Sequence, residues 1–444
     1  MTQRCYAELV EALSNNQIIK LPNHQITFVP SNMHILQLCK KFPFPQKDGE
    51  VIGIWMYSKG FHFHNHRVSV LAMNTRKHFS PPELLPNDWK NVADIKSVGM
   101  NSDISYPKMF LNLFSNRCYN IERFYSKEYE SHLIELLQNE KFDLVQLEGV
   151  YLSQYVPVIR KHSKAKIVLR TQNVEFEIWE REAEQNSFPK KNYLRLMARR
   201  MKQFELNMLN QYDALVPVSS RDAETFKSLG CNIPIQVCEH GVAPPSSLPK
   251  GEGNSRDHSL PLGGRDRDGA SVFHLGSMDW RPNLQGLEWF LENCWKKIHD
   301  EIPNAKLFLA GRNFPEDWKQ KKIDGVEMIG EVEDASSFMN SKQIMIVPLH
   351  AGSGIRVKLM EGMAMGKAIV STSIGAEGLP VIDGKNIFIA NEASDFAKRV
   401  IQLLKNPAMR NEMENEARKL AEEKFDYRVL VGELLEFYKN ILSA

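Results

Sequence analysis

Residues 351–372, AGSGIRVKLMEGMAMGKAIVST, bring small, basic and acidic residues together between two apolar segments. A turn of small residues lets a ligand approach the backbone, and the free N–H groups of a helix that follows it attract anions. Arginine and lysine add positive charge suited to phosphate, and a glutamate can accept hydrogen bonds from a pair of sugar hydroxyls. The residues able to do this are Gly352, Ser353, Gly354, Arg356, Lys358 and Glu361. Phosphate together with ribose indicates a nucleotide site.

The segments around this cluster are expected to be a strand, a turn, a helix and a second strand. Residues 344–349 form a short apolar run without alternation, which is typical of a strand buried on both faces. Apolar residues recur at helical spacing over 355–365, a glycine can end that helix, and 368–372 is again apolar. The helix N-terminus would then lie at the carboxyl end of the first strand. A plain surface pair of Lys358 with Glu361, worth about 0.2–0.5 kcal/mol, is an alternative that the spacing leaves open.

The composition excludes several classes of protein. The chain has 444 residues, a net charge of +2 and 43% hydrophobic residues. This balance is typical of a multidomain globular protein and lacks the excess of basic residues that nucleic-acid binding requires. No apolar run approaches the ~20 residues of a membrane span, and the first residues lack the apolar core of a signal peptide. We therefore expect a cytoplasmic enzyme that binds no nucleic acid.

Neither the cysteines nor the histidines are spaced as metal ligands. The six cysteines are scattered without C-x-x-C spacing. His62, His64 and His66 lie just before the apolar segment 67–73, where we expect solvated loop histidines. A D-x-D sequence at 266–268 has no strand around it. We therefore expect no metal and no other cofactor.

Strand and helix patterns alternate in two series. Candidate strands of the first series are 34–40, 67–73, 142–147, 166–171, 214–219 and 234–238, and those of the second are 272–275, 306–310, 326–330, 344–349, 368–372 and 386–390. Residues 244–269, rich in Pro, Gly, Ser and charge, have the composition of a flexible linker. The pattern predicts an α/β protein with two doubly wound, Rossmann-like domains that face a cleft. The predicted parts are an extension (1–32), a first domain (33–241), a linker (242–270), a second domain (271–424) and a C-terminal helix (425–444) that packs back on the first domain.

With HLGSMDWRPNLQGLEWF at 274–290, the stretch at 351–372 resembles the donor half of family-four glycosyltransferases of the group 1 type. The resemblance covers nearly the whole chain from about residue 33. Elsewhere it rests on KFPFPQKDGE (41–50), DLVQLEGVYLSQYVP (143–157), RTQNVEFEIWERE (170–182), LAGRN (309–313) and IGEVED (329–334). It implies the GT-B fold and a retaining transfer of sugar from a nucleotide-diphosphate sugar to a glycan or lipid-linked acceptor. The pathway it suggests is the synthesis of cell-surface polysaccharide or lipopolysaccharide.

The resemblance also assigns roles to single residues. Glu361 matches the helix glutamate that binds the donor ribose, and Arg356 with Lys358 matches the segment that cradles the diphosphate. The first domain would be the acceptor side, and Gln172 would lie there near the transferred sugar as a third catalytic candidate. The remaining residues that the resemblance places at the donor are Gly352, Ser353, Gly354, Gly276, Ser277, Arg312, Val332, Glu333 and Gly49.

Two departures from the family pattern keep other functions open. Ser353 stands where many relatives have the first Glu of E-x7-E, which contacts the transferred sugar, and Gln172 stands where close relatives have the His of H-N-V-E. A nucleotide-sugar epimerase of similar fold and a catalytically degenerate nucleotide-sugar-binding protein are the alternatives. An NAD-dependent oxidoreductase fits less well, since Val357 replaces the third glycine of G-x-G-x-x-G.

The acceptor side offers one further pattern. Residues 106–114, YPKMFLNLF, and the basic helix expected over 190–209 could meet a membrane surface that bears a lipid-linked glycan. Ordinary core packing of their apolar residues is the other interpretation. A peripheral position at the inner face of the membrane is therefore part of the expectation.

Overall fold

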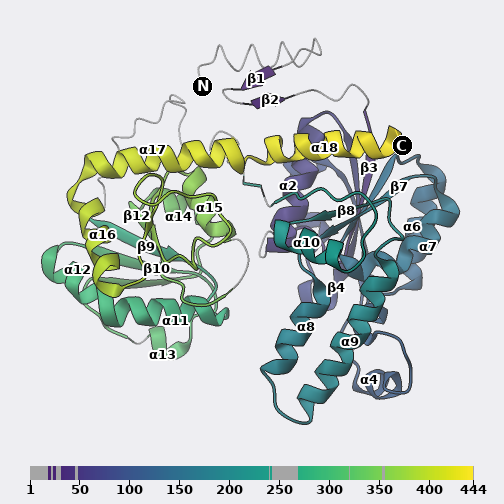
Figure 1. The fold of residues 1–444 in the computed structure, drawn as a ribbon, viewed down its shortest axis with the longest axis horizontal. Coiled ribbons are helices and arrows are strands. Elements are labelled where there is room, and N and C mark those ends of the chain that lie inside the picture. Colours follow the sequence, from purple (N-terminus) through teal and green to yellow (C-terminus); the bar gives the residue numbers. More distant parts are fainter. Residues whose placement is uncertain are drawn as a thin grey trace. The chain divides into compact units, whose positions relative to one another are not determined.

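The computed structural model describes residues 19–21, 24–26, 32–45, 49–239, 241–242, 269–319, 321–352 and 356–443. Most of the predicted linker, including the D-x-D sequence, lies outside these ranges, as do the predicted site residues Ser353 and Gly354. The chain divides into two compact units (Figure 1). The N-terminal unit comprises Met1–Gly241 with Tyr427–Ala444, and the C-terminal unit comprises Val242–Asp426.

Six parallel strands form the sheet of the N-terminal unit, in the order β5-β4-β3-β6-β7-β8. They are β3 (His34–Cys39), β4 (Arg67–Thr75), β5 (Asp94–Met100), β6 (Leu144–Glu148), β7 (Lys166–Thr171) and β8 (Ala214–Pro217). Every residue of β3 is buried, as expected for a strand that has helices on both faces. A short antiparallel pair, β1 (Ile19–Leu21) with β2 (His24–Ile26), precedes the sheet.

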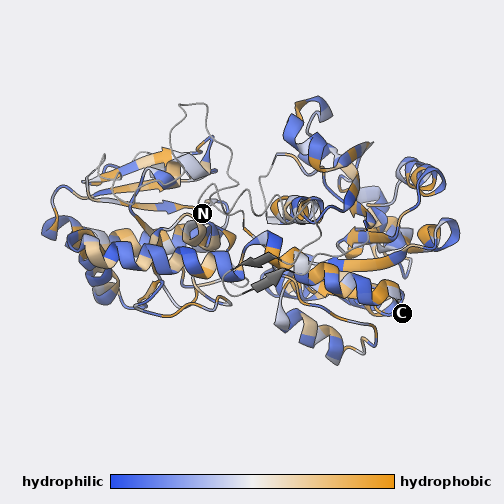
Figure 2. Ribbon diagram, turned by 90° about the horizontal axis from the view of Figure 1, so that it is seen from above, coloured by the Kyte–Doolittle hydropathy of each residue, from blue (hydrophilic) through white to orange (hydrophobic). Residues whose placement is uncertain are grey.

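Helices cover both faces of this sheet, and their hydrophilic residues alternate with apolar ones along the chain (Figure 2). One face packs against α2 and α18 through residues such as Trp55, Phe61 and Leu435. The other packs against α6, α7 and α9 through Leu133, Ile159 and other apolar residues. The helices are α2 (Gly49–Phe63), α3 (Asn87–Val92), α4 (Tyr106–Asn112), α5 (Tyr119–Glu122), α6 (Lys127–Asn139), α7 (Val156–His162), α8 (Glu175–Glu184), α9 (Lys190–Met208), α10 (Ser220–Ser228) and α18 (Tyr427–Ser443).

The C-terminal unit has a second sheet of six parallel strands, in the order β11-β10-β9-β12-β13-β14. They are β9 (Ser271–Leu275), β10 (Lys306–Ala310), β11 (Val326–Gly330), β12 (Ile344–Val347), β13 (Ala368–Ser371) and β14 (Phe388–Ile389). Its helices are α11 (Arg281–Phe290), which continues through a π-helical turn (Leu291–Trp295) into α12 (Lys296–Glu301), then α13 (Glu316–Lys319), α14 (Ala335–Asn340), α15 (Val357–Ala364), α16 (Ala393–Lys405) and α17 (Pro407–Lys424).

The two sheets have the same topology, and this places the sites. In chain order each runs third, second, first, fourth, fifth, sixth strand, so the direction of winding reverses between the first and fourth strands. Open parallel sheets bind ligands at this switch point, beyond the carboxyl ends of the strands. The switch points lie at β3 and β6 in the N-terminal unit and at β9 and β12 in the C-terminal unit. The predicted fold class, two doubly wound α/β sheets, is confirmed.

The C-terminal helix α18 belongs to the N-terminal unit, where it packs along α2 (Figure 1). The two helices approach closely, since a Cβ atom on Gly60 would lie 2.5 Å from Cγ2 of Val431. The hydroxyl of Tyr438 donates to Oε1 of Gln146 on β6 at 2.6 Å. The sheet and α18 are therefore joined by packing and by a buried hydrogen bond.

Two sequence expectations are wrong, and one strand, β5, was not predicted. Residues 234–238 form an isolated bridge, from Ile235 to Leu215, and no strand. Two of the expected loop histidines are buried rather than solvated. His66 Nδ1 accepts from the N–H of Met33 at 2.9 Å, and His64 Nε2 donates to the carbonyl of Arg428 at 2.8 Å.

Candidate functional site

The predicted donor residues of the C-terminal unit converge on the carboxyl edge of its sheet. Each of the four strands β9 to β12 is followed by at least one of them. Gly276 and Ser277 follow β9, Arg312 follows β10, Val332 and Glu333 follow β11, and Gly352, Arg356, Lys358 and Glu361 follow β12. Parallel strands therefore gather these residues at one edge although they are spread over 86 positions of the chain, from Gly276 to Glu361.

The loops after β9 and β10 pack backbone against backbone. Gly311 has a φ of +145°, and a Cβ atom there would lie 1.7 Å from the carbonyl oxygen of Gly276. A Cβ atom on Gly276 would in turn lie 2.6 Å from Nδ2 of Asn283. A side chain at Gly311 would therefore require the loops to move, and one at Gly276 would displace the Asn283 side chain.

Ser277 joins three polar side chains at this floor. Nε of Arg312 donates to its hydroxyl at 3.0 Å, and Nδ2 of Asn283 donates to its carbonyl at 2.9 Å. The hydroxyl of Ser277 donates to Asp279, and this bond, more than Asn313 or Arg312, holds the pKa of Asp279 below its usual value. Arg312 is therefore held at the site edge by Ser277.

Arg356 is the last residue before α15, and its guanidinium stacks on an aromatic ring. Its Cζ lies 5.0 Å from the ring centroid of Trp280, the residue that precedes α11. Burial lowers the pKa of Arg356, while Glu377 acts in the opposite direction. Sequence reasoning missed Trp280, because no local pattern indicates that this ring contacts Arg356.

Lys358 and Glu361 form an ion pair on α15. Nζ of Lys358 lies 2.6 Å from Oε2 of Glu361, and their side chains remain 40% and 23% exposed. This contact is the i,i+3 surface pair that the spacing left open. It also keeps the carboxylate and the ammonium together one turn from the helix N-terminus, where both remain accessible to solvent.

A buried histidine stands beneath this site. The ring of His274, on β9, donates through Nδ1 to the carbonyl of Ile346 on β12 at 3.0 Å and so ties the two switch-point strands together. Burial lowers the pKa of His274 to about 4, so the ring is neutral at neutral pH. Within the described ranges, no group of three or more His, Cys, Asp or Glu side chains is arranged to hold a metal ion.

The two remaining predicted residues lie in the N-terminal unit. Gly49 is the first residue of α2, after the loop that leaves β3, and no described atom lies within 4 Å of the position of a Cβ atom there. Gln172 follows β7 directly and is half-buried. Both therefore lie beyond the carboxyl ends of their strands, where the topology predicts a ligand.

Charged residues that the sequence did not single out surround this second edge. Lys40 and Lys41, after β3, place their Nζ atoms 3.5 and 3.1 Å from Oε2 of Glu50. The hydroxyl of Tyr151 donates to Oε2 of Glu175 at 2.9 Å, and Lys40 lies over the Tyr151 ring. Burial raises the pKa of Glu175, although Lys40 and Tyr151 oppose the shift. The edge combines cationic, acidic and aromatic groups, which suits hydroxyl-rich ligands.

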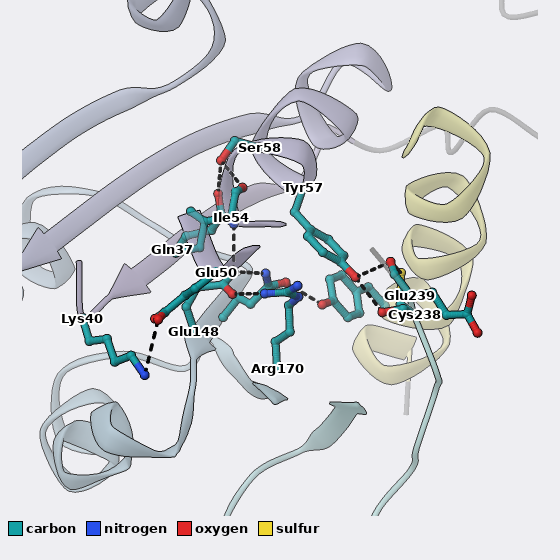
Figure 3. A network of polar contacts seen from close by, with 12 residues as sticks. Gln37, Lys40, Glu50, Ile54, Tyr57, Ser58, Glu148, Arg170, Cys238 and Glu239 are labelled. Carbon is teal, nitrogen blue, oxygen red and sulfur yellow. Dashed lines mark hydrogen bonds and ion pairs between the residues drawn. The ribbon is translucent and has the colours of Figure 1, made fainter. Parts of the chain in front are cut away.

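A buried polar network supports this edge from below (Figure 3). Nη1 of Arg170 on β7 lies 2.7 Å from Oε2 of Glu148 on β6, and both side chains are fully buried. Oε1 of the same glutamate accepts from Nε2 of Gln37 at 3.0 Å and from Nε2 of Gln146 at 2.6 Å. The Arg170 guanidinium also lies 4.2 Å from the ring centroid of Tyr57. Burial alone would lower the pKa of Arg170, but Glu148 and Tyr57 raise it above its usual value.

Comparisons with known proteins agree with this architecture. Residues 269–406 match the family Glycosyl transferases group 1. An "uncharacterized 44.6 kDa protein in cps region" from Klebsiella pneumoniae is 26% identical over 316 residues, which are 69% of this chain and 76% of that protein. A phosphatidyl-myo-inositol mannosyltransferase from Mycobacterium leprae is 23% identical over 205 residues, 44% of this chain and 54% of that protein. HepE from Anabaena, solved in complex with UDP-glucose, has a similar structure, with a TM-score of 0.60 and 13% identity over 92% of this chain and all of HepE.

The two doubly wound sheets and the sugar-transferase relatives define the class of protein. The chain has the fold of the GT-B glycosyltransferases. It is a glycosyltransferase, and its residues 269–406 match the group 1 family, as the resemblance of its motifs predicted. No helix among the described residues is both long and apolar enough to span a membrane.

Proposed function

We propose that the protein is a retaining glycosyltransferase that moves a sugar from a nucleotide-diphosphate sugar to a glycan or lipid-linked acceptor. The observation that carries this proposal is the position of Arg356, Lys358 and Glu361 at the start of α15, at the switch point of the second sheet. HepE binds UDP-glucose, and the Klebsiella relative is encoded in a cps region, which supports a role in cell-surface polysaccharide or lipopolysaccharide synthesis.

The chemistry requires that negative charge on the leaving diphosphate be stabilised. In this proposal the N–H groups at the start of α15, together with Arg356 and Lys358, hold that charge in a fixed arrangement. Such stabilisation needs no protein nucleophile and no metal, and transfer on the front face of the sugar would retain its configuration. Gln172 would contribute an amide hydrogen bond from the N-terminal unit, without a change of charge.

Donor binding tests the role of Glu361 directly. If its carboxylate binds the ribose hydroxyls, Glu361→Ala should weaken binding of the nucleotide by roughly 1.5–3 kcal/mol, the scale of charged hydrogen bonds. Calorimetry with UDP-, GDP- and ADP-sugars measures this after thermal stabilisation has identified the donor. Glu416→Ala is the control, because Glu416 forms a comparable surface pair with Lys385 in the same unit, at 3.2 Å. Equal affinities of Glu361→Ala and wild type would eliminate the role.

Turnover separates the proposal from its alternatives. A nucleotide-sugar epimerase would convert the donor in the absence of any acceptor. A degenerate binding protein would bind the donor without turning it over, and the glutamine at position 172 is the feature that favours it. Gln172→His should preserve or raise transfer in an active enzyme, whereas restored turnover in an inactive wild type would show that the chain is degenerate.

For the acceptor we propose contact with a membrane that carries lipid-linked glycan. A group of large apolar side chains on and after α4 is exposed rather than packed in the core: Tyr106, Phe110, Leu111, Leu113 and Phe114. Phe110 and Phe114 are 62% and 80% exposed and contact each other edge to face. Lys108 on the same helix and the exposed Arg117 add positive charge that suits anionic headgroups.

Sedimentation with lipid vesicles tests this contact. Replacing Phe110 and Phe114 together by serine should reduce binding to vesicles that contain phosphatidylglycerol by about 100-fold or more, because roughly 1.5–3 kcal/mol is lost for each apolar side chain that no longer inserts. The unfolding temperature should remain unchanged, since neither side chain is part of the core. Ile382→Ser, at an exposed position of the C-terminal unit (55%), is the matched control. Undiminished sedimentation of the double variant would refute the contact.

A further inference from the structure

Trp280 and Arg356 form one stacked unit across the switch point of the C-terminal sheet. We propose that Trp280 is a positioning residue for sugar transfer, because it holds the Arg356 guanidinium in the orientation that the donor diphosphate requires. The inference rests on the proposed function and adds to it a residue for which neither the motifs nor the relatives assign a role.

The stack connects the two loops between which a ligand of this fold binds. Trp280 lies at the start of α11, after β9, and Arg356 lies at the start of α15, after β12. β9 and β12 are neighbours in the sheet, paired at Val272 with Ile344. The 5.0 Å separation of Cζ from the ring centroid is within the range of a cation–π contact. The ring therefore fixes a cation of one loop to the other loop.

Gly352 limits the stack on one side. Its φ is +115°, and a Cβ atom there would lie 2.8 Å from Cζ2 of Trp280 and 2.9 Å from Nη2 of Arg356. The indole and the guanidinium both pass directly over this backbone position, where no side chain can be accommodated. Gly352, predicted to let a ligand approach the backbone, thus also leaves room for Trp280 and Arg356. Gly352 therefore confines both planar groups on this side.

This confinement matters for binding an anion. A free arginine side chain has many rotamers and loses that freedom when it binds phosphate, whereas a guanidinium already fixed on a ring loses less. Trp280 is 36% exposed, so the stack lies at the surface of the unit rather than in its core.

A role that is only structural would give different results from a positioning role. We therefore propose measuring nucleotide binding by calorimetry for wild type, Trp280→Ala, Trp280→Phe, Arg356→Ala and the double variant Trp280→Ala/Arg356→Ala. The probe is whichever of UDP, GDP and ADP the wild type binds, with the corresponding nucleoside as the phosphate-free comparison. Thermal unfolding of each variant identifies any loss of folding.

Trp280→Ala should raise the Kd for the nucleoside diphosphate about tenfold and leave the Kd for the nucleoside unchanged. Trp280→Phe should restore most of the affinity, since a phenyl ring can still stack. In the Arg356→Ala background, Trp280→Ala should have no further effect, because no guanidinium remains to be positioned. An equal loss in both backgrounds, or an unchanged diphosphate affinity in Trp280→Ala, would overturn the inference and leave the proposed function intact. If the wild type binds none of the three nucleotides, the result contradicts both this inference and the proposed function.

Discussion

Glu148→Ala is expected to destabilise the N-terminal unit by about 3–5 kcal/mol, because it leaves the guanidinium of Arg170 charged and without its carboxylate inside the sheet. Arg170 and Glu148 are fully buried and 2.7 Å apart. The mutation also removes the acceptor of the Gln37 and Gln146 amides. Hydrogen exchange of the β6 and β7 peptides measures the effect within this unit alone, without requiring the whole chain to unfold in one step.

A double variant makes that test specific. In Glu148→Leu/Arg170→Met both charges are absent, so destabilisation should be clearly smaller than in Glu148→Ala, as is found when apolar residues replace a buried ion pair of similar volume. The exposed pair of Arg117 and Glu122, 3.3 Å apart, serves as the control. Glu122→Ala should cost less than about 1 kcal/mol. If Glu148→Ala exchanged as slowly as wild type, the charge of Arg170 would have to be compensated by other groups.

The second large effect is expected on turnover. Arg356→Ala should lower kcat by about 100-fold, the loss typical of removing one group that stabilises charge in the transition state. The kcat of Arg356→Lys should lie between those of wild type and Arg356→Ala, because lysine keeps the charge but loses the planar fork and the stack on Trp280. Steady-state kinetics with the identified donor measures both variants. Lys296→Ala, at an exposed pair on α12, is the control.

The same assay examines the proposal that transfer proceeds without a metal. Wild-type activity in EDTA should stay within about twofold if cationic side chains and helix N–H groups stabilise the leaving diphosphate. A large loss in EDTA that Mn²⁺ or Mg²⁺ reverses would contradict the proposal. Undiminished turnover in Arg356→Ala would instead exclude this arginine from the chemistry.

The sequence was sufficient to predict the interior strands of the sheets but not the strands at their edges. β12 was predicted because continuous apolar segments are typical of strands buried on both faces. β5, DIKSVGM, is an edge strand with mostly exposed or half-exposed residues, so it has no such run. Residues 234–238 are apolar enough to suggest a strand, but among the described residues Ile235 alone of these five forms a bridge. Which segment pairs at an edge depends on tertiary contacts that a local pattern does not contain.

The site residues were predictable from the sequence where the backbone requires a glycine. Gly276 and Gly352 lie where a Cβ atom would come within 3 Å of neighbouring side chains, and both were singled out as glycines. Trp280 was not, because an aromatic residue at a helix start is ordinary until its partner Arg356 is known. The same holds for Glu148 and Arg170, which pair only because β6 and β7 lie side by side in a register that sets these residues opposite each other.

The path of the chain through the two units has a consequence for its biosynthesis. The core of the N-terminal unit includes Leu434, Leu435 and Tyr438 of α18, yet the whole C-terminal unit, Val242–Asp426, is translated before them. While the ribosome synthesises the C-terminal unit, the apolar face of β3, β6 and α2 remains uncovered, because α18 has not yet been made. The C-terminal unit is continuous in the chain and can complete its core first. We therefore expect the unit whose synthesis begins first to complete its core last, and its uncovered apolar face to be a site of aggregation during synthesis.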